Sequence, residues 1–330
     1  MLYRAAFGWK WTGDSPEPLM ADDIFDLASL TKVVATTTAA MQLVEQGRLD
    51  LDRPVATYWP DFAANGKAAI TVRQLLTHTS GLPADLEAAG TWSGPEAGLA
   101  RAAAIKAAHR PGERFGYSDV NFIALAALVQ KLSGEPLDVY ARRHVFEPLK
   151  MGDTGFLPPA AERSRIVPTD RLDGRLLWGE VQDPSARRMG GVAGHAGLFS
   201  TGDDLARFAQ MLLNGGELDG DRILRPETVA LMTRPEATPG GYWRGLGWDM
   251  ASPYSRVFDA AFGPSSFGHT GYTGCSIWID PDSGRFLIIL TSRLNPDDHG
   301  DVKPLREKLA ALVGPSGQAS GVIQVSGPAR

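Results

Sequence analysis

The chain has 330 residues, 43% of them hydrophobic and 22% charged, so its composition is that of a globular protein that can bury a substantial core. Its formal net charge is -5, and Lys and Arg nowhere cluster among aromatic residues, which argues against nucleic acid as a partner. The single cysteine, Cys275, excludes an internal disulfide and cannot supply a zinc cluster.

The sequence contains no segment typical of a signal peptide or of a membrane-spanning helix. The first nine residues contain no continuous apolar run followed by a small-residue cleavage site. The longest apolar runs, 122–129 and 286–290, fall far short of the roughly 20 residues that a spanning helix needs. We therefore expect a cytoplasmic chain as given, or a truncated envelope protein, with no membrane as partner.

In the first part of the chain, one strand signal is followed by several helix signals. The aromatic-rich segment 2–9 precedes a turn and predicts a strand. Residues 29–46 contain neither Gly nor Pro, repeat apolar residues at helical spacing and are followed by Gly47, which predicts a buried helix. Further helices are predicted over 71–76, 121–132 and 137–145, and the prolines and glycines of 151–193 predict a long structured loop.

The last third of the chain changes from helical to strand periodicity and back. Thr201 or Asp203 is expected to cap a helix that ends at residue 213, and a second helix is predicted over 226–232. A Pro-Asp-Ser-Gly turn joins predicted strands at 275–280 and 284–291. A helix follows over 302–312, and within a tail rich in Gly, Ser and Pro, 321–325 is a candidate edge strand.

This order predicts an α+β fold in which both ends of the chain contribute to one antiparallel sheet flanked by helices, with an all-α lobe inserted. We expect a single catalytic domain over 1–313. Its sheet lobe would comprise 1–28 and 256–313, its helical lobe 29–255, and residues 314–330 would form a mobile tail. A cleft is expected between the lobes.

Ser29 and Lys32 lie three residues apart at the start of a predicted helix, so their side chains project from one face about one turn apart. Lysine can deprotonate a serine there if burial lowers its pKa, and the helix N-terminus favours the developing negative charge. By itself this spacing is uninformative, because it arises by chance about once in a chain of this length.

Two further segments supply complementary chemistry. Tyr117 follows a turn and precedes an apolar helix, where its phenol can point into a cleft. A phenolate is a strong base, and a neighbouring Lys32 ammonium would lower its pKa. His269-Thr270-Gly271 opens a predicted strand, where the backbone amide of Tyr272, with that of Ser29, would form an oxyanion hole.

Taken together in this order, Ser29-x-x-Lys32, Tyr117-Ser-Asp119 and His269-Thr-Gly271 resemble the motifs of the serine β-lactamase and penicillin-binding protein superfamily, in its class C β-lactamase-like branch. That branch includes DD-peptidases, D-aminopeptidases and family VIII carboxylesterases. The resemblance covers residue 1 to about residue 312. It extends to the segments Phe25-Asp-Leu-Ala-Ser29, Leu75-Leu-Thr-His-Thr-Ser-Gly-Leu82, Gly194-His-Ala-Gly-Leu-Phe-Ser-Thr201 and Asp280-Pro-Asp.

The resemblance implies a role for each matching residue. Ser29 would be the nucleophile, Lys32 its proton partner, Tyr117 the shared general base and acid, and the Ser29 and Tyr272 amides the oxyanion donors. Asp119, His195, His269, Thr270 and Gly271 would contact substrate, although for His195 a place in the cleft wall and a scaffold role both stay open. For His78 we expect a hydrogen bond that stabilises its loop.

Three departures from the family pattern carry information. Asp119 replaces an asparagine and, as an acceptor only, cannot donate to an acylamido carbonyl, but it can pair with Lys32 and keep that amine charged. His269 replaces a lysine and is expected to be largely neutral near pH 7, which favours uncharged esters. Family members usually begin with an additional helix and strand, so one sheet edge here must be exposed, paired in a dimer or covered by the tail.

The leading interpretation is a carboxylesterase that acts on small esters through an acyl-enzyme on Ser29, with weak or no β-lactamase activity and with neither cofactor nor metal. A DD-peptidase or a class C-like β-lactamase is the alternative within enzymes. From another class, a catalytically silent module that binds peptidoglycan fragments stays open. The sequence gives neither the acyl-chain preference nor the oligomeric state.

Overall fold

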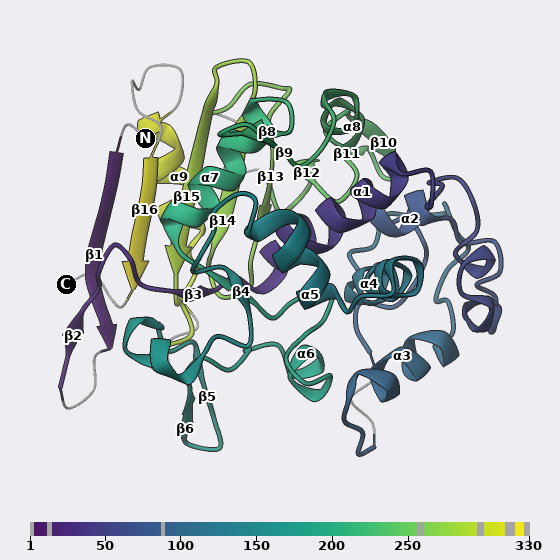
Figure 1. Cartoon of the computed structure of the whole chain (residues 1–330), viewed down its shortest axis with the longest axis horizontal. Helices are drawn as coiled ribbons and strands as arrows, with labels where there is room; N and C mark the ends of the chain where they lie inside the picture. The colour runs from purple at the N-terminus through teal and green to yellow at the C-terminus, as the bar shows by residue number, and fades with distance from the viewer. Residues whose placement is uncertain are drawn as a thin grey trace.

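The structure, a computed structural model, describes residues 3–11, 15–86, 90–255, 258, 261–295, 300–313 and 321–326. A large sheet forms one side of the molecule and a group of helices forms the other (Figure 1). Among the described residues, no helix combines the length and hydrophobicity that a membrane span requires.

The large sheet has nine strands in the order β10-β11-β12-β13-β14-β15-β16-β1-β2. Neighbouring strands are antiparallel, except that β16 runs parallel to both β1 and β15. This confirms the predicted α+β class with an antiparallel sheet built from both chain ends. The strands are β1 (Tyr3–Trp11), β2 (Glu17–Pro18), β10 (Glu236–Thr238), β11 (Tyr242–Arg244), β12 (Asp249–Ala251), β13 (Phe267–Thr270), β14 (Ser276–Asp280), β15 (Arg285–Thr291) and β16 (Gly321–Ser326).

Two features of this sheet differ from the prediction. The C-terminal strand β16 is not an edge strand, because it pairs with β1 on one side and with β15 on the other. It covers the side of β1 that the sequence left open, and β2 covers the other side. The sheet also begins before residue 256, since β10, β11 and β12 belong to it. Residues 314–320 and 327–330 of the predicted mobile tail lie outside the described residues.

Helices cover both faces of the sheet. On β15, Ile288 and Leu290 face the main core, while Leu287 and Ile289 pack in a second cluster with Ala310 of α9. Because successive side chains of a strand point to opposite faces, these two clusters place α7 (Gly202–Leu213) and α9 (Lys303–Val313) on opposite sides of the sheet. The predicted cap of α7 is Thr201, whose side chain accepts a hydrogen bond from the Asp204 amide.

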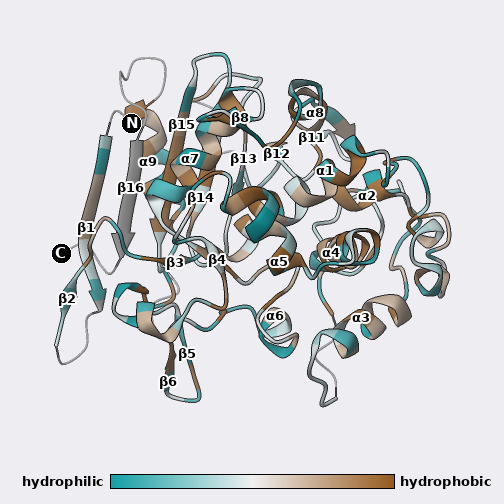
Figure 2. Cartoon of the chain, viewed as in Figure 1, coloured by the Kyte–Doolittle hydropathy of each residue, from teal (hydrophilic) through white to brown (hydrophobic). Residues whose placement is uncertain are grey.

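The other lobe is built around the apolar helix α4, whose residues are buried on nearly every side and which contacts α1, α2, α3 and α5 (Figure 2). The predicted helices are present, with the one at 29–46 divided into a 3-10 turn, a π-helical segment and α1. Helix α3 was not predicted. The helical elements are η1 (Ala28–Leu30), η2 (Lys32–Thr37), α1 (Thr38–Glu45), η3 (Val55–Thr57), η4 (Pro60–Ala63), α2 (Val72–Leu76), α3 (Pro95–Ala104), α4 (Asp119–Ser133), α5 (Leu137–Ala141), η5 (Arg142–Phe146), η6 (Ala160–Arg165), α6 (Pro184–Arg188), α7 (Gly202–Leu213), α8 (Pro226–Met232) and α9 (Lys303–Val313).

Short strand pairs fix the connections between the lobes. A three-stranded sheet in the order β3-β7-β4 brings the segment before Ser29 against the segment after His195. Within the predicted long loop lie β4, η6, β5, β6 and α6, so this loop is structured. The remaining strands are β3 (Phe25–Asp26), β4 (Gly155–Phe156), β5 (Asp170–Leu172), β6 (Arg175–Leu177), β7 (Leu198–Ser200), β8 (Glu217–Leu218) and β9 (Asp221–Arg222).

The buried Arg306 of α9 joins that helix to the loop between β13 and β14. Its Nη2 atom donates to the carbonyls of Gly274 at 2.8 Å and Cys275 at 2.9 Å, and Gly271 O lies 3.5 Å away. We expect Arg306→Met to fill most of the same volume but to leave these carbonyls without this donor, lowering the free energy of unfolding by about 3 kcal/mol. Urea denaturation measures this change.

The exposed Lys308 on the same helix supplies the control for Arg306. Lys308→Met removes a positive charge without removing a buried hydrogen bond, so its free energy of unfolding should stay within about 0.5 kcal/mol of the wild-type value. Equal stability of the Arg306→Met and Lys308→Met variants would contradict the assigned role of Arg306.

Candidate active site

Ser29 lies at a constrained turn between β3 and the long helical segment. The preceding Ala28 has φ +46°, in the left-handed region, which costs a residue with a Cβ about 1 kcal/mol. The buried carboxylate of Asp26 fixes this turn, because its Oδ1 accepts the Ala28 amide at 2.9 Å. Its Oδ2 accepts the Gln182 amide at 2.8 Å, which ties the turn to the long loop.

Lys32 is completely buried, and its amine has polar partners from three separate parts of the chain. Nζ donates to Ser29 Oγ at 2.9 Å and to the backbone carbonyl of His195 at 3.1 Å. It forms an ion pair with Asp119 Oδ1 at 2.6 Å. The pairing of Lys32 with Asp119 that the sequence suggested is therefore present.

Tyr117 lies on a loop directly before α4. Lys32 Nζ lies 5.0 Å from the centroid of its ring, and Tyr117 and Ser29 line the same pocket. Its ring stacks on the His78 imidazole, with a centroid separation of 4.4 Å. His78 Nδ1 accepts the Ser118 amide at 3.1 Å, so the expected loop-stabilising hydrogen bond of His78 is present. These contacts bring the hydroxyl, the amine and the phenol of the three predicted catalytic residues together.

The electrostatics of this trio differ from the expectation in one respect. Burial lowers the pKa of Lys32, but the charges of Asp119 and Tyr117 outweigh it, so the pKa lies above the ordinary lysine value. Burial also raises the pKa of Tyr117, more than the Lys32 ammonium lowers it. The predicted lowering of the Tyr117 pKa is therefore wrong: the motifs indicate the neighbouring ammonium, but the depth at which the phenol is buried depends on the tertiary structure.

A pocket of about 170 Å³ opens beside Ser29. Its lining includes Tyr117 and the predicted substrate residues His269, Thr270, Gly271 and Tyr272. Gly271 lies against the Ser29 turn so closely that a Cβ would be 2.5 Å from the carbonyl of Leu27, which explains why glycine is needed there. The Tyr272 carbonyl accepts a hydrogen bond from Arg293 Nε at 2.6 Å, which fixes the loop that carries the predicted oxyanion amide.

His269 is uncharged at neutral pH. Burial lowers its pKa well below the ordinary histidine value, and the positive charges of Arg244 and Lys32 lower it further. Nδ1–H donates to the Thr270 carbonyl at 2.9 Å, which fixes the ring orientation. The expectation of a neutral His269 agrees with this environment.

Three pocket residues were missed from the sequence: Arg244, Asp249 and Tyr254. Arg244 is fully buried and forms an ion pair with Asp249, with Nη1 3.5 Å from Oδ1. Both belong to the β11–β12 pair, which carried no clear strand pattern in the sequence. Without that strand pair, nothing indicated that this arginine would lie near Ser29.

Asp119 and His195, which the family resemblance placed among the substrate-binding residues, do not line this pocket. Their contacts are with the amine of Lys32: Asp119 through its carboxylate and His195 through its backbone carbonyl. The imidazole of His195 points elsewhere, with Nε2 2.8 Å from Asp183 Oδ1. These contacts favour an action of both residues through Lys32 over contact with substrate.

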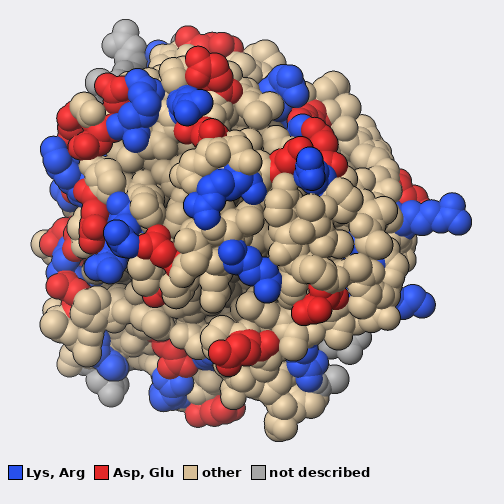
Figure 3. Space-filling model, turned by 45° about the vertical axis from the view of Figure 1, so that its right-hand side comes forward, with Lys and Arg blue, Asp and Glu red and all other residues tan. Residues whose placement is uncertain are grey.

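On the face shown in Figure 3, basic and acidic side chains are interspersed, with no continuous basic area. This distribution agrees with the net charge of -5 and gives no footprint for a nucleic acid on that face.

Asp26 provides a test of the turn before Ser29. Burial raises its pKa to about 6, despite the amides of Gln182 and Ala28, from an ordinary value of 3.8. The folded state therefore binds this proton more tightly than the unfolded state, so the contribution of Asp26 to stability falls as pH rises from about 4 to about 6. We expect the free energy of unfolding of wild type, relative to Asp26→Asn, to decrease by about 2 kcal/mol over this interval.

Urea denaturation of both proteins at pH 4 and pH 7 measures this difference. Asp61→Asn, which removes an exposed carboxylate, is the control and should show no comparable change. A relative stability of Asp26→Asn that does not vary with pH would show that the Asp26 pKa is ordinary.

Three kinds of comparison connect this arrangement with known proteins. The family model described as Beta-lactamase matches residues 1–312. A Bacillus subtilis (strain 168) protein named "N-acetylmuramyl-L-alanine amidase" is 33% identical, with 92% of this chain and 78% of that protein covered. An Escherichia coli (strain K12) protein named "Putative D-alanyl-D-alanine carboxypeptidase" is 32% identical, with 89% and 76% covered.

Among solved structures, one described as a family VIII carboxylesterase superposes with a TM-score of 0.69. It is 25% identical in sequence, and the match covers 92% of this chain and 86% of that one. The names of these relatives thus include an amidase, a carboxypeptidase and a carboxylesterase.

Proposed function

The chain belongs to the beta-lactamase family of serine hydrolases, and we propose that it hydrolyses small uncharged esters through an acyl-enzyme on Ser29. The observation that carries this proposal is the charge balance of the pocket. Its buried guanidinium, Arg244, is paired with Asp249, and His269 is neutral. An uncharged substrate can enter such a pocket without leaving a charge uncompensated.

In the proposed first step, Ser29 Oγ attacks the ester carbonyl and its proton passes to the Tyr117–Lys32 pair. The amides of Ser29 and Tyr272 donate to the oxyanion of the tetrahedral intermediate. When the intermediate collapses, the carbon–oxygen bond to the alcohol breaks, and the alcohol leaves with the proton that the pair returns. Ser29 then carries the acyl group as an ester.

In the second step, a water molecule gives a proton to the same pair and attacks the acyl-enzyme. The bond to Ser29 Oγ breaks, the proton returns to Ser29, and the carboxylic acid is released. Because the pKa values of Lys32 and Tyr117 are both raised, the resting pair is fully protonated at neutral pH. It must lose one proton before Ser29 can attack, so alkaline pH favours its reactive form.

Tyr117→Phe tests the proton transfer. This change removes the phenol hydroxyl but keeps the ring that stacks on His78, so the fold should be retained. We expect kcat for a p-nitrophenyl ester to fall by about 10²–10⁴-fold, the usual contribution of a positioned acid–base group. A kcat within about threefold of wild type, in a variant that unfolds at the same urea concentration, would exclude Tyr117 from proton transfer.

A second candidate function is cleavage of D-alanyl peptides. It is favoured by the relatives at 32–33% identity that are named as a putative D-alanyl-D-alanine carboxypeptidase and an N-acetylmuramyl-L-alanine amidase. A peptide carboxylate entering the pocket would have to replace Asp249 as the partner of Arg244. Because this would break an existing buried ion pair, we rank peptide cleavage second.

One panel of substrates separates these functions: a short-chain p-nitrophenyl ester, a D-Ala-D-Ala peptide and a chromogenic cephalosporin. We expect turnover of the ester, little or no turnover of the cephalosporin, and loss of ester turnover to the background rate in Ser29→Ala. Faster cleavage of the peptide than of the ester would select the second function. Stable labelling by penicillin without turnover of any substrate would favour a binding module.

A further inference from the structure

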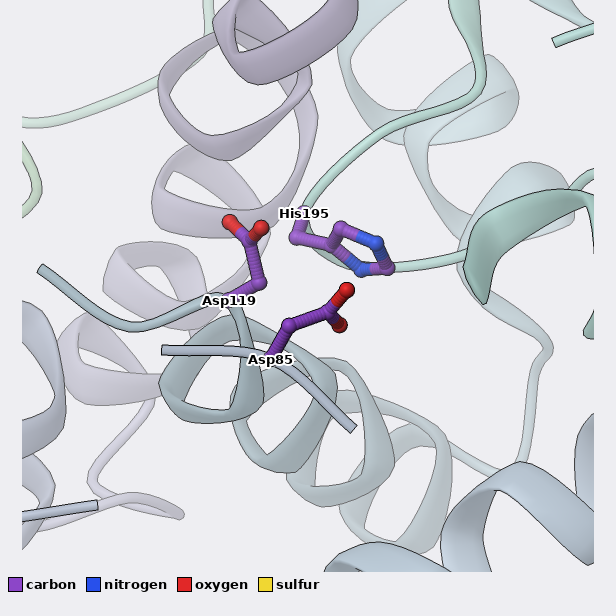
Figure 4. Close-up of side chains that lie close together, drawn as sticks. All are labelled: Asp85, Asp119 and His195. Carbon is purple, nitrogen blue, oxygen red and sulfur yellow. The ribbon is translucent and has the colours of Figure 1, made fainter. Parts of the chain in front are cut away.

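A group of potential metal ligands lies outside the pocket beside Ser29. Asp85, Asp119 and His195 each offer one ligand atom, and these three atoms lie within 4.8 Å of one another (Figure 4). They come from three parts of the chain: the loop after α2, the first turn of α4 and the loop before β7. None of the three lines the pocket beside Ser29.

The imidazole of His195 supplies an independent observation that points to a ligand. The residue is only 1% exposed, yet its Nδ1 forms no hydrogen bond with any part of the chain that the structure describes. Figure 4 shows this ring facing the carboxylate of Asp85. Leaving a buried polar nitrogen without a partner costs about 1–3 kcal/mol. A ligand that bonds to Nδ1 would remove this penalty, which favours its binding.

The other ring nitrogen already has the partner that metal-binding histidines usually have. Nε2 lies 2.8 Å from Asp183 Oδ1, and that oxygen is fixed by the Ala186 amide at 2.7 Å. A carboxylate that accepts the second N–H of a ligating histidine sets its tautomer and makes the free nitrogen a better donor to a metal. Burial lowers the pKa of His195, but the charge of Asp183 raises it above the ordinary value, so a metal bound at Nδ1, the atom that faces the group, would replace the proton there while Nε2–H stays on Asp183.

We propose that Asp85, Asp119 and Nδ1 of His195 bind one divalent transition-metal ion of the Zn²⁺ or Mn²⁺ type. Two carboxylate oxygens and one imidazole nitrogen suit these ions, and three protein ligands leave positions for water. Small side-chain rotations bring atoms within 4.8 Å of one another to the bond lengths of about 2.0–2.2 Å that zinc requires.

Both carboxylates can reach the ion without losing their present contacts. Asp85 is oriented by the Leu86 amide at 2.6 Å and by Ser185 Oγ at 2.9 Å, and it is partly exposed, which gives the ion access from solvent. Asp119 pairs with Lys32 through Oδ1. Because a carboxylate has about four lone-pair sites, that of Asp119 can accept a hydrogen bond from Lys32 and bind the ion at the same time.

Lys32 also limits the affinity of the site. Its ammonium repels a cation bound to the same carboxylate, so binding should be weaker than at a structural zinc site. The ion would lie one carboxylate away from the amine that contacts Ser29. The metal is separate from the chemistry of ester hydrolysis proposed above, and its binding is measured independently of that activity.

The test is calorimetric titration of the full chain, dialysed against EDTA and then against buffer, with ZnCl₂, MnCl₂ and MgCl₂ in separate experiments. We expect one saturable site per chain for Zn²⁺ or Mn²⁺ and weaker binding of Mg²⁺. Asp85→Asn and His195→Gln should each weaken binding at least tenfold, and Asp183→Asn should weaken it about 10–100-fold through His195.

The controls separate this site from unspecific binding and from misfolding. Asp85 has no part in the proposed catalysis, so Asp85→Asn should keep wild-type ester turnover, which shows that it is folded. Asp61→Asn should bind metal as wild type does, because this carboxylate is exposed and distant in sequence from the group. Absence of saturable binding to wild type, or equal binding to wild type and folded Asp85→Asn, would overturn the proposal.

Discussion

The burial of one positive charge, the amine of Lys32, is the constraint on which the rest of the site depends. A buried ammonium is strongly unfavourable unless it is paired and hydrogen-bonded, and here its partners are Ser29 Oγ, the carboxylate of Asp119 and the carbonyl of His195. These partners come from the β3–η1 turn, the start of α4 and the segment before β7. Satisfying this one charge therefore brings together the parts of the chain that build the site.

Burial also determines the protonation of the other groups around Ser29. The pKa of Tyr117 rises because its phenol is removed from water, and that of Lys32 rises because a carboxylate lies next to it. His269 moves in the opposite direction, since burial and two nearby cations favour its neutral form. The result is a protonated Tyr117–Lys32 pair beside a pocket whose own charges balance, an arrangement that supports acyl transfer from uncharged substrates.

The sheet positions the other half of the site. The loop after β13 carries Tyr272, and it is fixed from outside by Arg293 and by the buried Arg306 of α9. Near Lys32, His195 has an Nδ1 atom without a hydrogen-bond partner among the described residues, in a group with the carboxylates of Asp85 and Asp119. Lys32 thus contacts one residue of a pocket suited to a neutral substrate, Ser29, and one member of a group of ligands suited to a cation, Asp119.

The sequence by itself determined the fold class, most of the α-helices and the strands β1, β14, β15 and β16, because hydrophobic period and turn residues are local properties of the chain. The order of its motifs also predicted that Ser29, Lys32 and Tyr117 would form the site. Only the tertiary structure decided the place of β16 between β1 and β15, the presence of Arg244 in the pocket and the raised pKa of Tyr117. Strand neighbours, ion pairs and burial depend on segments far apart in the chain. No local pattern records them, because each is fixed only when those segments pack together.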